Sequence, residues 1–395
     1  MERTSNNFKK TSIGRKQIVQ SGVFSLALMM FSSHAGGGFA TGNQANTYFV
    51  GFGNMGIISA IFAMFILSFV VREAIIMYRA NDLKSYKDLF KCLYHPFDKL
   101  SIFFEIFYQI MVLMAIASAI SGAASALKEY MNFNYVVAAI MVSAIVLFLV
   151  IFGADFVRKI SAVMGIVILV TAISIYIIGS FMGEGIFTIM KADFIENGFS
   201  NFPKAGINSF VYAGFQCVQI PSLIACSNVI NNKNEASLSM NIAFIINFIA
   251  LVLSVTMLLS WRSVYMNVDG GEVLPTLTST QAMGFKWMGI FYSISLFMCL
   301  LSTAVSIAYG FVANFENTKV ISIIKSVKIR RAIVALFIIS ISMFISMVGL
   351  TNIIKYGYGY CGYIAIIFII IPFMTVGVYK NRKIFERKIE TKMNT

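Results

Sequence analysis

The chain has 395 residues, of which 58% are hydrophobic and 12% are charged, and its formal net charge is +14. A soluble domain usually carries about 25% charged residues, so this composition excludes an ordinary soluble protein and indicates a polytopic membrane protein. The positive residues lie between apolar segments rather than on one soluble face, so we expect no nucleic-acid partner.

The N-terminal tail carries Lys9, Lys10, Arg15 and Lys16 just before the first apolar stretch. Positive residues, an apolar run and the small residues of "SSHA" are together typical of a cleaved signal peptide. The alternative is a first membrane helix that continues past the glycines that follow. The tail by itself leaves both interpretations open.

Long apolar segments recur along the whole chain. A membrane-spanning helix needs about 20 mostly apolar residues. We therefore predict an all-α polytopic membrane protein with ten spanning helices, near residues 17–48, 50–77, 100–126, 134–153, 157–181, 204–230, 237–261, 286–313, 330–350 and 357–379.

The distribution of Lys and Arg supports this topology. With the N-terminus placed in the cytoplasm, 25 of these residues fall on the inner side and six on the outer side. Positive residues concentrate in cytoplasmic loops, so both termini are predicted to be cytoplasmic. The predicted units are a tail (1–16), a first five-helix repeat (17–181), an outer loop (182–203), a second repeat (204–379) and a tail (380–395). The connection 262–285 is expected to hold a short helix on the outer face.

Two of the apolar segments are interrupted by residues that disfavour a regular helix. The first reads "SSHAGGGFATGNQ" from residue 32, and the second reads "SFVYAGFQCVQIPSLIAC" over residues 209–226. Interrupted helices at matching positions of two halves point to the binding site of a secondary transporter. Here they fall in spans one and six, which predicts two inverted five-helix repeats. The alternative is that the glycines only allow close helix packing.

If the interruptions bind a solute, their backbone and nearby side chains are the candidate ligands. In the first segment these are the three consecutive glycines and a threonine, and in the second they are aromatic and amide side chains; Tyr108 of span three is a further candidate. The predicted substrate-binding residues are Gly36, Gly37, Gly38, Thr41, Tyr108, Tyr212, Phe215, Gln216 and Gln219.

Few ionisable residues lie within the predicted spans, and such residues are usually functional. His34 adjoins the first interruption, where it either carries a proton or forms an ordinary hydrogen bond. Arg72 and Glu105 lie at the same predicted depth, so they either form an inner gate or face cytoplasmic water. Lys159, at the start of span five, is a further candidate, although a topological role for its charge is the simpler interpretation.

The stretch "GFATGNQANTYFVGFG" resembles the pattern G-F-A-S-G-Q-E, followed by aromatic residues and Gly, of the YkvI-type bacterial membrane proteins. Those proteins are similar to the LeuT-fold amino acid–polyamine–organocation transporters. The resemblance implies that spans one, two, six and seven rock against spans three, four, eight and nine, with the solute between the two interruptions. Where the pattern has Gln-Glu, this chain has Asn43 and Gln44, so an amide replaces a carboxylate.

The same resemblance implies a sodium site between span one and span eight. Backbone carbonyls near Ala35 and the hydroxyls of Ser302 and Thr303 would be its ligands. The alternative is that these hydroxyls bond back to the preceding helical turn. In proton-coupled relatives a lysine of span five occupies the cation site, which is the functional interpretation of Lys159.

These observations predict a secondary active transporter in the bacterial plasma membrane that takes up an amino acid or amine together with Na⁺. The alternatives are a proton-coupled transporter, a non-transporting nutrient receptor of the same fold, and a membrane scaffold or channel. No enzyme or cofactor is expected, because two histidines cannot form a metal cluster and no nucleotide-binding loop occurs.

Overall fold

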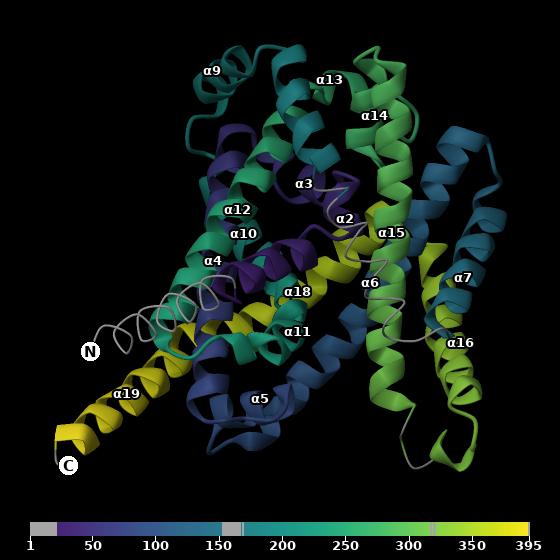
Figure 1. Cartoon of the computed structure of the whole chain (residues 1–395). Coiled ribbons are helices and arrows are strands. Elements are labelled where there is room, and N and C mark those ends of the chain that lie inside the picture. Colours follow the sequence, from purple (N-terminus) through teal and green to yellow (C-terminus); the bar gives the residue numbers. More distant parts are fainter. Residues whose placement is uncertain (1–21, 152–166, 168–169, 317, 319–320, 394–395) are drawn as a thin grey trace, which may run out of the picture.

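The computed structural model describes residues 22–151, 167, 170–316, 318 and 321–393, and these residues form helices and connecting turns (Figure 1). Six helical segments are long and apolar enough to cross a membrane, and a pair bent by 72°, Val170–Met182 with Ile186–Asn197, makes up to seven. The helices Gly22–His34 and Tyr135–Ile151 are apolar but shorter. Length and composition alone therefore do not establish the predicted count of ten.

The helices that the structure describes begin and end close to the predicted boundaries. The closest matches are α4 (Gly53–Ala80), α6 (Ser101–Met131), α7 (Tyr135–Ile151), α12 (Lys233–Ser260), α15 (Lys286–Phe315) and α16 (Val327–Ser346). Residues 157–166, 168 and 169 of the predicted span 157–181 lie outside the described residues, and residues 170–181 are helical.

Three short helices lie in the connections. The helix α5 (Tyr86–Tyr94) begins after Ser85, whose side chain accepts a hydrogen bond from Asp88 N and so caps the first turn. A second, α9 (Ile186–Asn197), occupies the predicted outer loop. The third, α14 (Pro275–Ala282), lies in the connection 262–285, where a short helix was expected, and its residues 275–280 are buried. It packs on α12, α13 (Arg262–Tyr265) and α15.

The long helices pack as two groups, which Figure 1 shows on the left and on the right. In one group α4 packs extensively on α12 and on α10 (Phe202–Gln216). In the other, α6 packs on α15, α16 and α7. This grouping matches the two bundles that the resemblance implied. Between the groups lie α2 (Gly37–Ala40), which contacts α6 and α15, and α3 (Asn43–Tyr48), which contacts α10 and α12.

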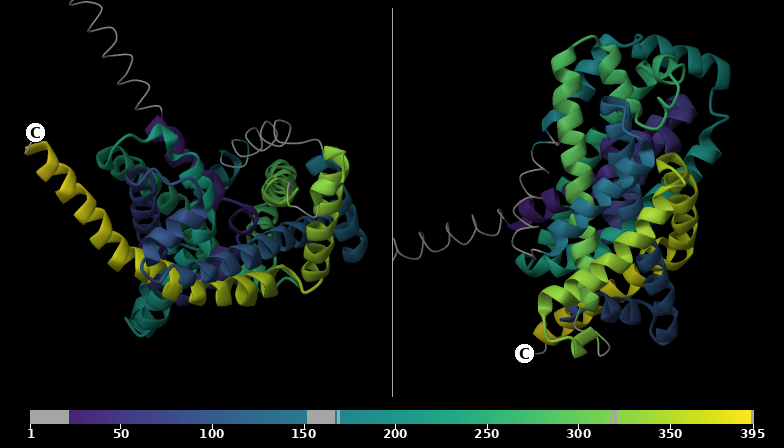
Figure 2. Two further views of the ribbon diagram at one scale, coloured as in Figure 1. Left: turned by 90° about the horizontal axis from the view of Figure 1, so that it is seen from below. Right: turned by 90° about the vertical axis from the view of Figure 1, so that its right-hand side faces the viewer.

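The two ends of the bundle differ. Helices α9, α13 (Arg262–Tyr265) and α14 lie at one end, here named the α9 end, and α5 lies at the other, named the α5 end (Figure 1). The C-terminal segment Leu350–Ile384 is helical throughout and includes π-helical turns. It continues into α19 (Val378–Met393), which projects away from the bundle at the α5 end (Figure 2). The predicted boundary at residue 380 therefore falls inside a helix.

Candidate functional site

The first interruption is a real break in the helical backbone. The helix Gly22–His34 ends, residues 35–36 form a turn, α2 spans only four residues, and α3 follows after Gly42. Gly42 has φ of +80°, a left-handed conformation that glycine adopts without steric cost. Within the break, the amides of Phe39 and Ala40 both donate to Gly36 O. The chain thus changes direction twice within eight residues and leaves short backbone stretches outside any regular helix.

The second interruption is a tightened turn rather than an opened one. After α10, residues Cys217–Gln219 form a 3₁₀ turn, and α11 (Ile220–Ala225) continues from it. The backbone at Gln216, Cys217 and Gln219 stays in the right-handed helical region. The expectation of unwound backbone near Gln219 is therefore wrong. Pro221 lacks the N–H that would bond to the carbonyl of Cys217, and a 3₁₀ turn accommodates this loss without unwinding.

A chain of buried polar side chains joins the two interruptions. His34 Nε2 lies 2.9 Å from the Tyr212 hydroxyl, which in turn donates to Gln44 Oε1 over 3.2 Å. Gln216 Nε2 donates to the same Gln44 oxygen over 3.4 Å. All four side chains are buried. The predicted residues His34, Tyr212 and Gln216 are thus brought together. Gln44 accepts hydrogen bonds from Tyr212 and Gln216, and His34 is linked to it through Tyr212.

The role of each ring nitrogen of His34 depends on its tautomer. When the Tyr212 hydroxyl donates to Gln44, Nε2 of His34 donates to Tyr212 and Nδ1 of the neutral ring is an acceptor. His34 also interacts with Asn247 of α12, whose amide nitrogen donates to Ala243 O over 2.7 Å. Both His34 Nδ1 and Asn247 Oδ1 are buried without a hydrogen-bond partner. With the proton on Nε2 both atoms are acceptors that lack a donor, whereas a proton on Nδ1 would be donated to Asn247 Oδ1.

Gln219 is another side chain with unused hydrogen-bonding capacity. It is only 5% exposed, yet neither its amide nitrogen nor its amide oxygen has a partner among the described residues. A buried amide without partners costs free energy unless a ligand or water satisfies it. Gln219 was predicted from the sequence, and the structure leaves both of its polar atoms without a bond.

Aromatic rings enclose this polar group toward the α9 end. The Phe215 ring lies 5.2 Å from that of Tyr48 and 5.1 Å from that of Tyr358, and the Tyr212 and Phe49 rings are 4.9 Å apart. Tyr48 donates to Ile354 O over 2.7 Å, which ties α3 to the C-terminal segment. Phe215 therefore packs within an aromatic cluster, as a wall of the site.

The loop before α14 closes over the first interruption. The Asn43 amide nitrogen donates to Glu272 O, Val273 O and Thr351 Oγ1 over 2.9–3.1 Å. Thr276 N donates to Thr41 O over 3.3 Å. The hydroxyl of Thr41 bonds within its own turn, to Gly38 O. These bonds attach α14 and its loop directly to the broken backbone and bury it on that side.

The two predicted sodium ligands on α15, Ser302 and Thr303, lie in different environments. Thr303 faces the first interruption, because a Cβ built on Gly36 would lie 3.7 Å from Thr303 Oγ1. One turn earlier, the Cys299 thiol lies 3.8 Å from Ala35 O. Ser302 instead donates to Cys299 O over 3.0 Å, within its own helix. The structure thus places Thr303 beside Ala35 and Gly36, while Ser302 bonds back to the preceding turn.

Tyr108 lies elsewhere than predicted. Its ring is 5.4 Å from that of Tyr86 and 6.1 Å from that of Phe104, so it belongs to the contact between α5 and α6. The sequence placed Tyr108 on the correct helix, but it did not reveal that α5 folds back against this face and packs on the ring.

Arg72 and Glu105 do not form the predicted gate. Arg72 pairs with the adjacent Glu73 and donates to Ser237 of α12, whereas Glu105 pairs with Lys87 over 3.1 Å. The reason is α5, which supplies Lys87 as a closer partner. Lys159 lies outside the described residues.

Sequence reasoning missed Asn247 as a site residue and assigned no contact to Gln44. The signal for Asn247 was an amide in the middle of an otherwise apolar helix, where a polar group needs a partner. Among the residues that the structure describes, no three His, Cys, Asp or Glu side chains are grouped as a metal site.

Solved structures show which fold this arrangement belongs to. A substrate-bound, outward-open Na⁺-coupled sialic acid symporter matches with a TM-score of 0.52 and 12% identity, covering 92% of this chain and 98% of its own. A manganese transporter of Eremococcus coleocola matches with a TM-score of 0.57 and 15% identity over 90% and 78%. MhsT in complex with L-phenylalanine matches with a TM-score of 0.58 and 13% identity over 92% and 97%.

No family model and no curated protein matches the sequence, so the resemblance to YkvI-type proteins stays a prediction. The structural matches are LeuT-fold transporters and not enzymes. At these identities they establish the fold: this chain has the fold of LeuT-type membrane transporters.

Proposed function

We propose that this protein is a secondary transporter that moves a small organic solute, such as an amino acid, across the bacterial plasma membrane together with Na⁺. It would have ten spanning helices in two inverted repeats, with both termini and the α5 end in the cytoplasm. The observation that carries the proposal is that several buried polar atoms at or beside the two interruptions have no hydrogen-bond partner among the described residues. They are His34 Nδ1, Asn247 Oδ1 and both polar atoms of the Gln219 amide.

These atoms suggest the chemistry of the solute. The acceptors of His34 and Asn247 can each take a hydrogen bond from a donor, and a solute ammonium supplies donors. The Gln219 amide offers both a donor and an acceptor, which suits a carboxylate or a hydroxyl. The side chains that make up this group, His34, Gln44, Tyr212, Gln216, Gln219 and Asn247, include no carboxylate and no Lys or Arg. A zwitterion fits such a site, because it brings no net charge that the protein would have to neutralise.

The coupling ion is proposed to bind beside Ala35 and Gly36. Thr303 and the carbonyl of Ala35 are neutral oxygen ligands at a break in the helix, as is typical of Na⁺ sites in such transporters. This is the region that the resemblance implied, with Thr303 as the better placed of the two hydroxyls. The sialic acid symporter, whose structure is similar, is Na⁺-coupled, which supports the choice of ion.

Uptake into proteoliposomes tests the proposal. Purified protein would be screened by thermal shift against amino acids and amines in Na⁺ and in K⁺, and stabilising solutes would then be tested for uptake. We expect accumulation that requires an inward Na⁺ gradient and is abolished when the gradient is dissipated.

Each other result has a defined meaning. Binding without accumulation would indicate a receptor, and accumulation driven only by a proton gradient would move the coupling role to His34. If no solute stabilises the protein in either salt, the group of unpartnered atoms is not a binding site and the proposal fails.

A further inference from the structure

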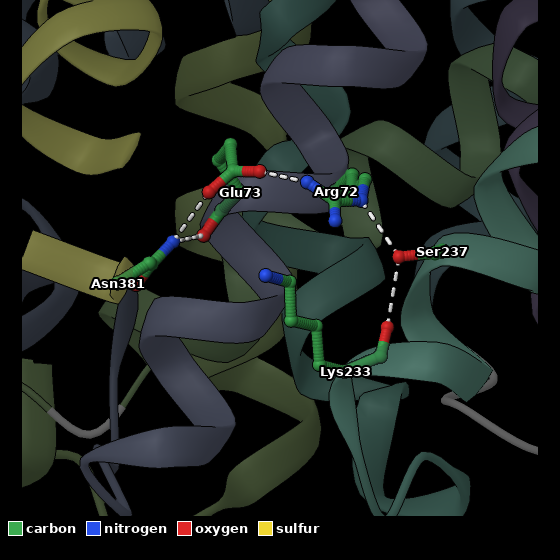
Figure 3. Close-up of polar contacts among 5 residues, drawn as sticks. All are labelled: Arg72, Glu73, Lys233, Ser237 and Asn381. Carbon is green, nitrogen blue, oxygen red and sulfur yellow. Dashed lines mark hydrogen bonds and ion pairs between the residues drawn. The ribbon is translucent and has the colours of Figure 1, made fainter. Parts of the chain in front are cut away.

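The α5 end of the bundle contains a buried carboxylate that the proposed solute site does not use. Glu73, near the end of α4, is 3% exposed. One of its oxygens pairs with Arg72, and the other accepts a hydrogen bond from Asn381 of α19 over 2.7 Å (Figure 3). Asn381 also donates to the backbone carbonyl of Glu73 over 3.0 Å. A buried carboxylate is costly unless it is paired and hydrogen-bonded, so the contact with α19 contributes directly to its stability.

The neighbouring residue of α19 makes a second attachment, to a different element. The Lys380 ammonium donates to the carbonyls of Cys92, Leu93 and His95 over 2.8–3.1 Å. These carbonyls lie at the C-terminal end of α5, where the last turn has no intrahelical donors and carries a partial negative charge. Lys380 therefore caps α5 from another helix.

Arg72 extends the same network to the opposite side of α4. Its Nε donates to Ser237 Oγ of α12 over 2.8 Å, and Ser237 donates to Lys233 O within α12 (Figure 3). The Lys233 side chain extends toward the same group (Figure 3). Four elements, α4, α5, α12 and α19, are thus connected through two adjacent pairs, Arg72–Glu73 and Lys380–Asn381.

The remainder of α19 differs sharply from these two positions. Beyond Asn381 the helix projects away from the bundle (Figure 2), and its Arg382 pairs with Glu386 of the same helix, where both side chains are exposed. Among the described side chains of α19, those of Lys380 and Asn381 make the polar contacts with α4 and α5. These contacts lie within one helical turn, so breaking only a few hydrogen bonds would loosen this part of the helix from its neighbours.

We propose that Lys380 and Asn381 form a latch that holds α19 against α4 and α5, and that this latch opens when the α5 end of the bundle opens. The latch itself rests only on the contacts above. Its role in opening the solute path rests on the proposed function.

Labelling of the native Cys92 tests the latch without a transport assay. Cys92 is half-buried on α5, and its own carbonyl accepts a bond from Lys380. We expect Asn381→Ala to raise the rate of Cys92 modification by a maleimide about tenfold, the scale of one lost hydrogen bond to a charged group. Peptide-resolved mass spectrometry would measure the rate, with the buried Cys217 and Cys299 as internal references for global unfolding.

A second variant separates latch opening from thiol chemistry. Burial raises the pKa of the Cys92 thiol and Lys380 opposes this effect, so Lys380→Met changes thiol reactivity as well as the contact. Hydrogen–deuterium exchange over residues 86–95 avoids this problem, and we expect faster exchange in both Asn381→Ala and Lys380→Met. Arg382→Gln, which removes an exposed pair one residue away, is the matched control.

The outcomes distinguish the latch from the proposed function. If both variants label and exchange at the rates of wild type and of Arg382→Gln, the latch does not exist, whether or not the protein transports a solute. If labelling accelerates while wild type shows no solute uptake, the latch stands and the proposed function fails. If labelling accelerates but uptake is unchanged from wild type, the link between latch and opening is overturned.

Discussion

The two interrupted segments look alike in the sequence and differ in the structure. Residues 34–48 contain a left-handed glycine and two turns, so that backbone groups lie outside any regular helix. Residues 216–220 keep right-handed backbone angles throughout and only tighten into a 3₁₀ turn. The first interruption thus presents backbone to the site, whereas the second presents side chains, chiefly Gln216 and Gln219. Glycine and proline therefore interrupt a helix in different ways.

The glycines of the two segments also have different roles. Gly42 is needed for its conformation, because its φ of +80° disfavours every side chain. Gly214 is needed for its size, because a Cβ there would lie 2.6 Å from Gly362 O on α18 (Gly359–Ala365). The packing interpretation of glycine is thus correct for Gly214, and the conformational one is correct for Gly42.

The largest expected effect comes from Gly42→Ala. The left-handed backbone alone would cost about 1–2 kcal/mol, and the new Cβ would overlap Thr276 Oγ1. We expect a clearly lower thermal midpoint in detergent and loss of solute binding. Gly51→Ala is the control, because no atom lies within 4 Å of its Cβ position. Equal thermal midpoints for the two variants would contradict the left-handed conformation of Gly42 and its close approach to Thr276.

Gly214→Ala tests the role of close packing in the second segment. The added methyl group would push α10 from α18, at a cost of about 1–3 kcal/mol for an overpacked site. On the same helix, Gly206→Ala meets no atom within 4 Å, so it should be neutral or slightly stabilising, because alanine is the better helix former. Thermal denaturation of both variants measures the difference. A neutral Gly214→Ala would contradict the close contact.

Thr303→Val tests the proposed Na⁺ site beside Ala35 and Gly36. It keeps the shape of the side chain but removes the hydroxyl that faces Gly36, so the Na⁺ concentration for half-maximal solute binding should rise about tenfold, the scale of one lost ligand. Ser302→Ala should change this concentration far less, because that hydroxyl bonds to Cys299 O. Titrating solute binding with Na⁺ measures this concentration for both variants. The reverse order of effects would assign the ion to Ser302 instead.

Gln219→Leu should produce the smallest effect on stability and a selective effect on binding. The substitution removes two buried polar atoms that have no protein partner, so the thermal midpoint without solute should stay the same or rise. Solute affinity should fall about tenfold if the amide binds the solute. Gln281→Leu, at an exposed position of α14, controls for the loss of an amide. An unchanged affinity would remove Gln219 from the site.

The helical framework was largely predictable, because burial in lipid requires long apolar helices whose ends are marked by charge. The predicted span 286–313 and the observed α15, Lys286–Phe315, show how closely hydropathy follows such a helix. Short helices in the connections were not predictable in the same way. The helix α5 has only nine residues, and its packing on α6 decided the positions of Tyr108 and Glu105.

The candidate site was predicted in part. His34, Tyr212, Gln216 and Gln219 were identified as polar residues in apolar surroundings, and the structure brings three of them into one hydrogen-bonded group. Asn247 was missed, because an amide in a mostly apolar helix shows no partner until the opposite helix is placed. Arg72 was predicted to pair with Glu105, but its partner is Glu73.

The sequence by itself determined that this protein is a bundle of apolar helices with two interruptions, because the cost of burying polar backbone and charge in lipid is local and depends on residue type. Only the tertiary structure decided what each interruption does and which polar groups meet. Hydrogen bonds such as Tyr212 to Gln44 and Asn381 to Glu73 join residues more than 160 positions apart. Their formation depends on the orientation of whole helices, which packing sets and local sequence does not.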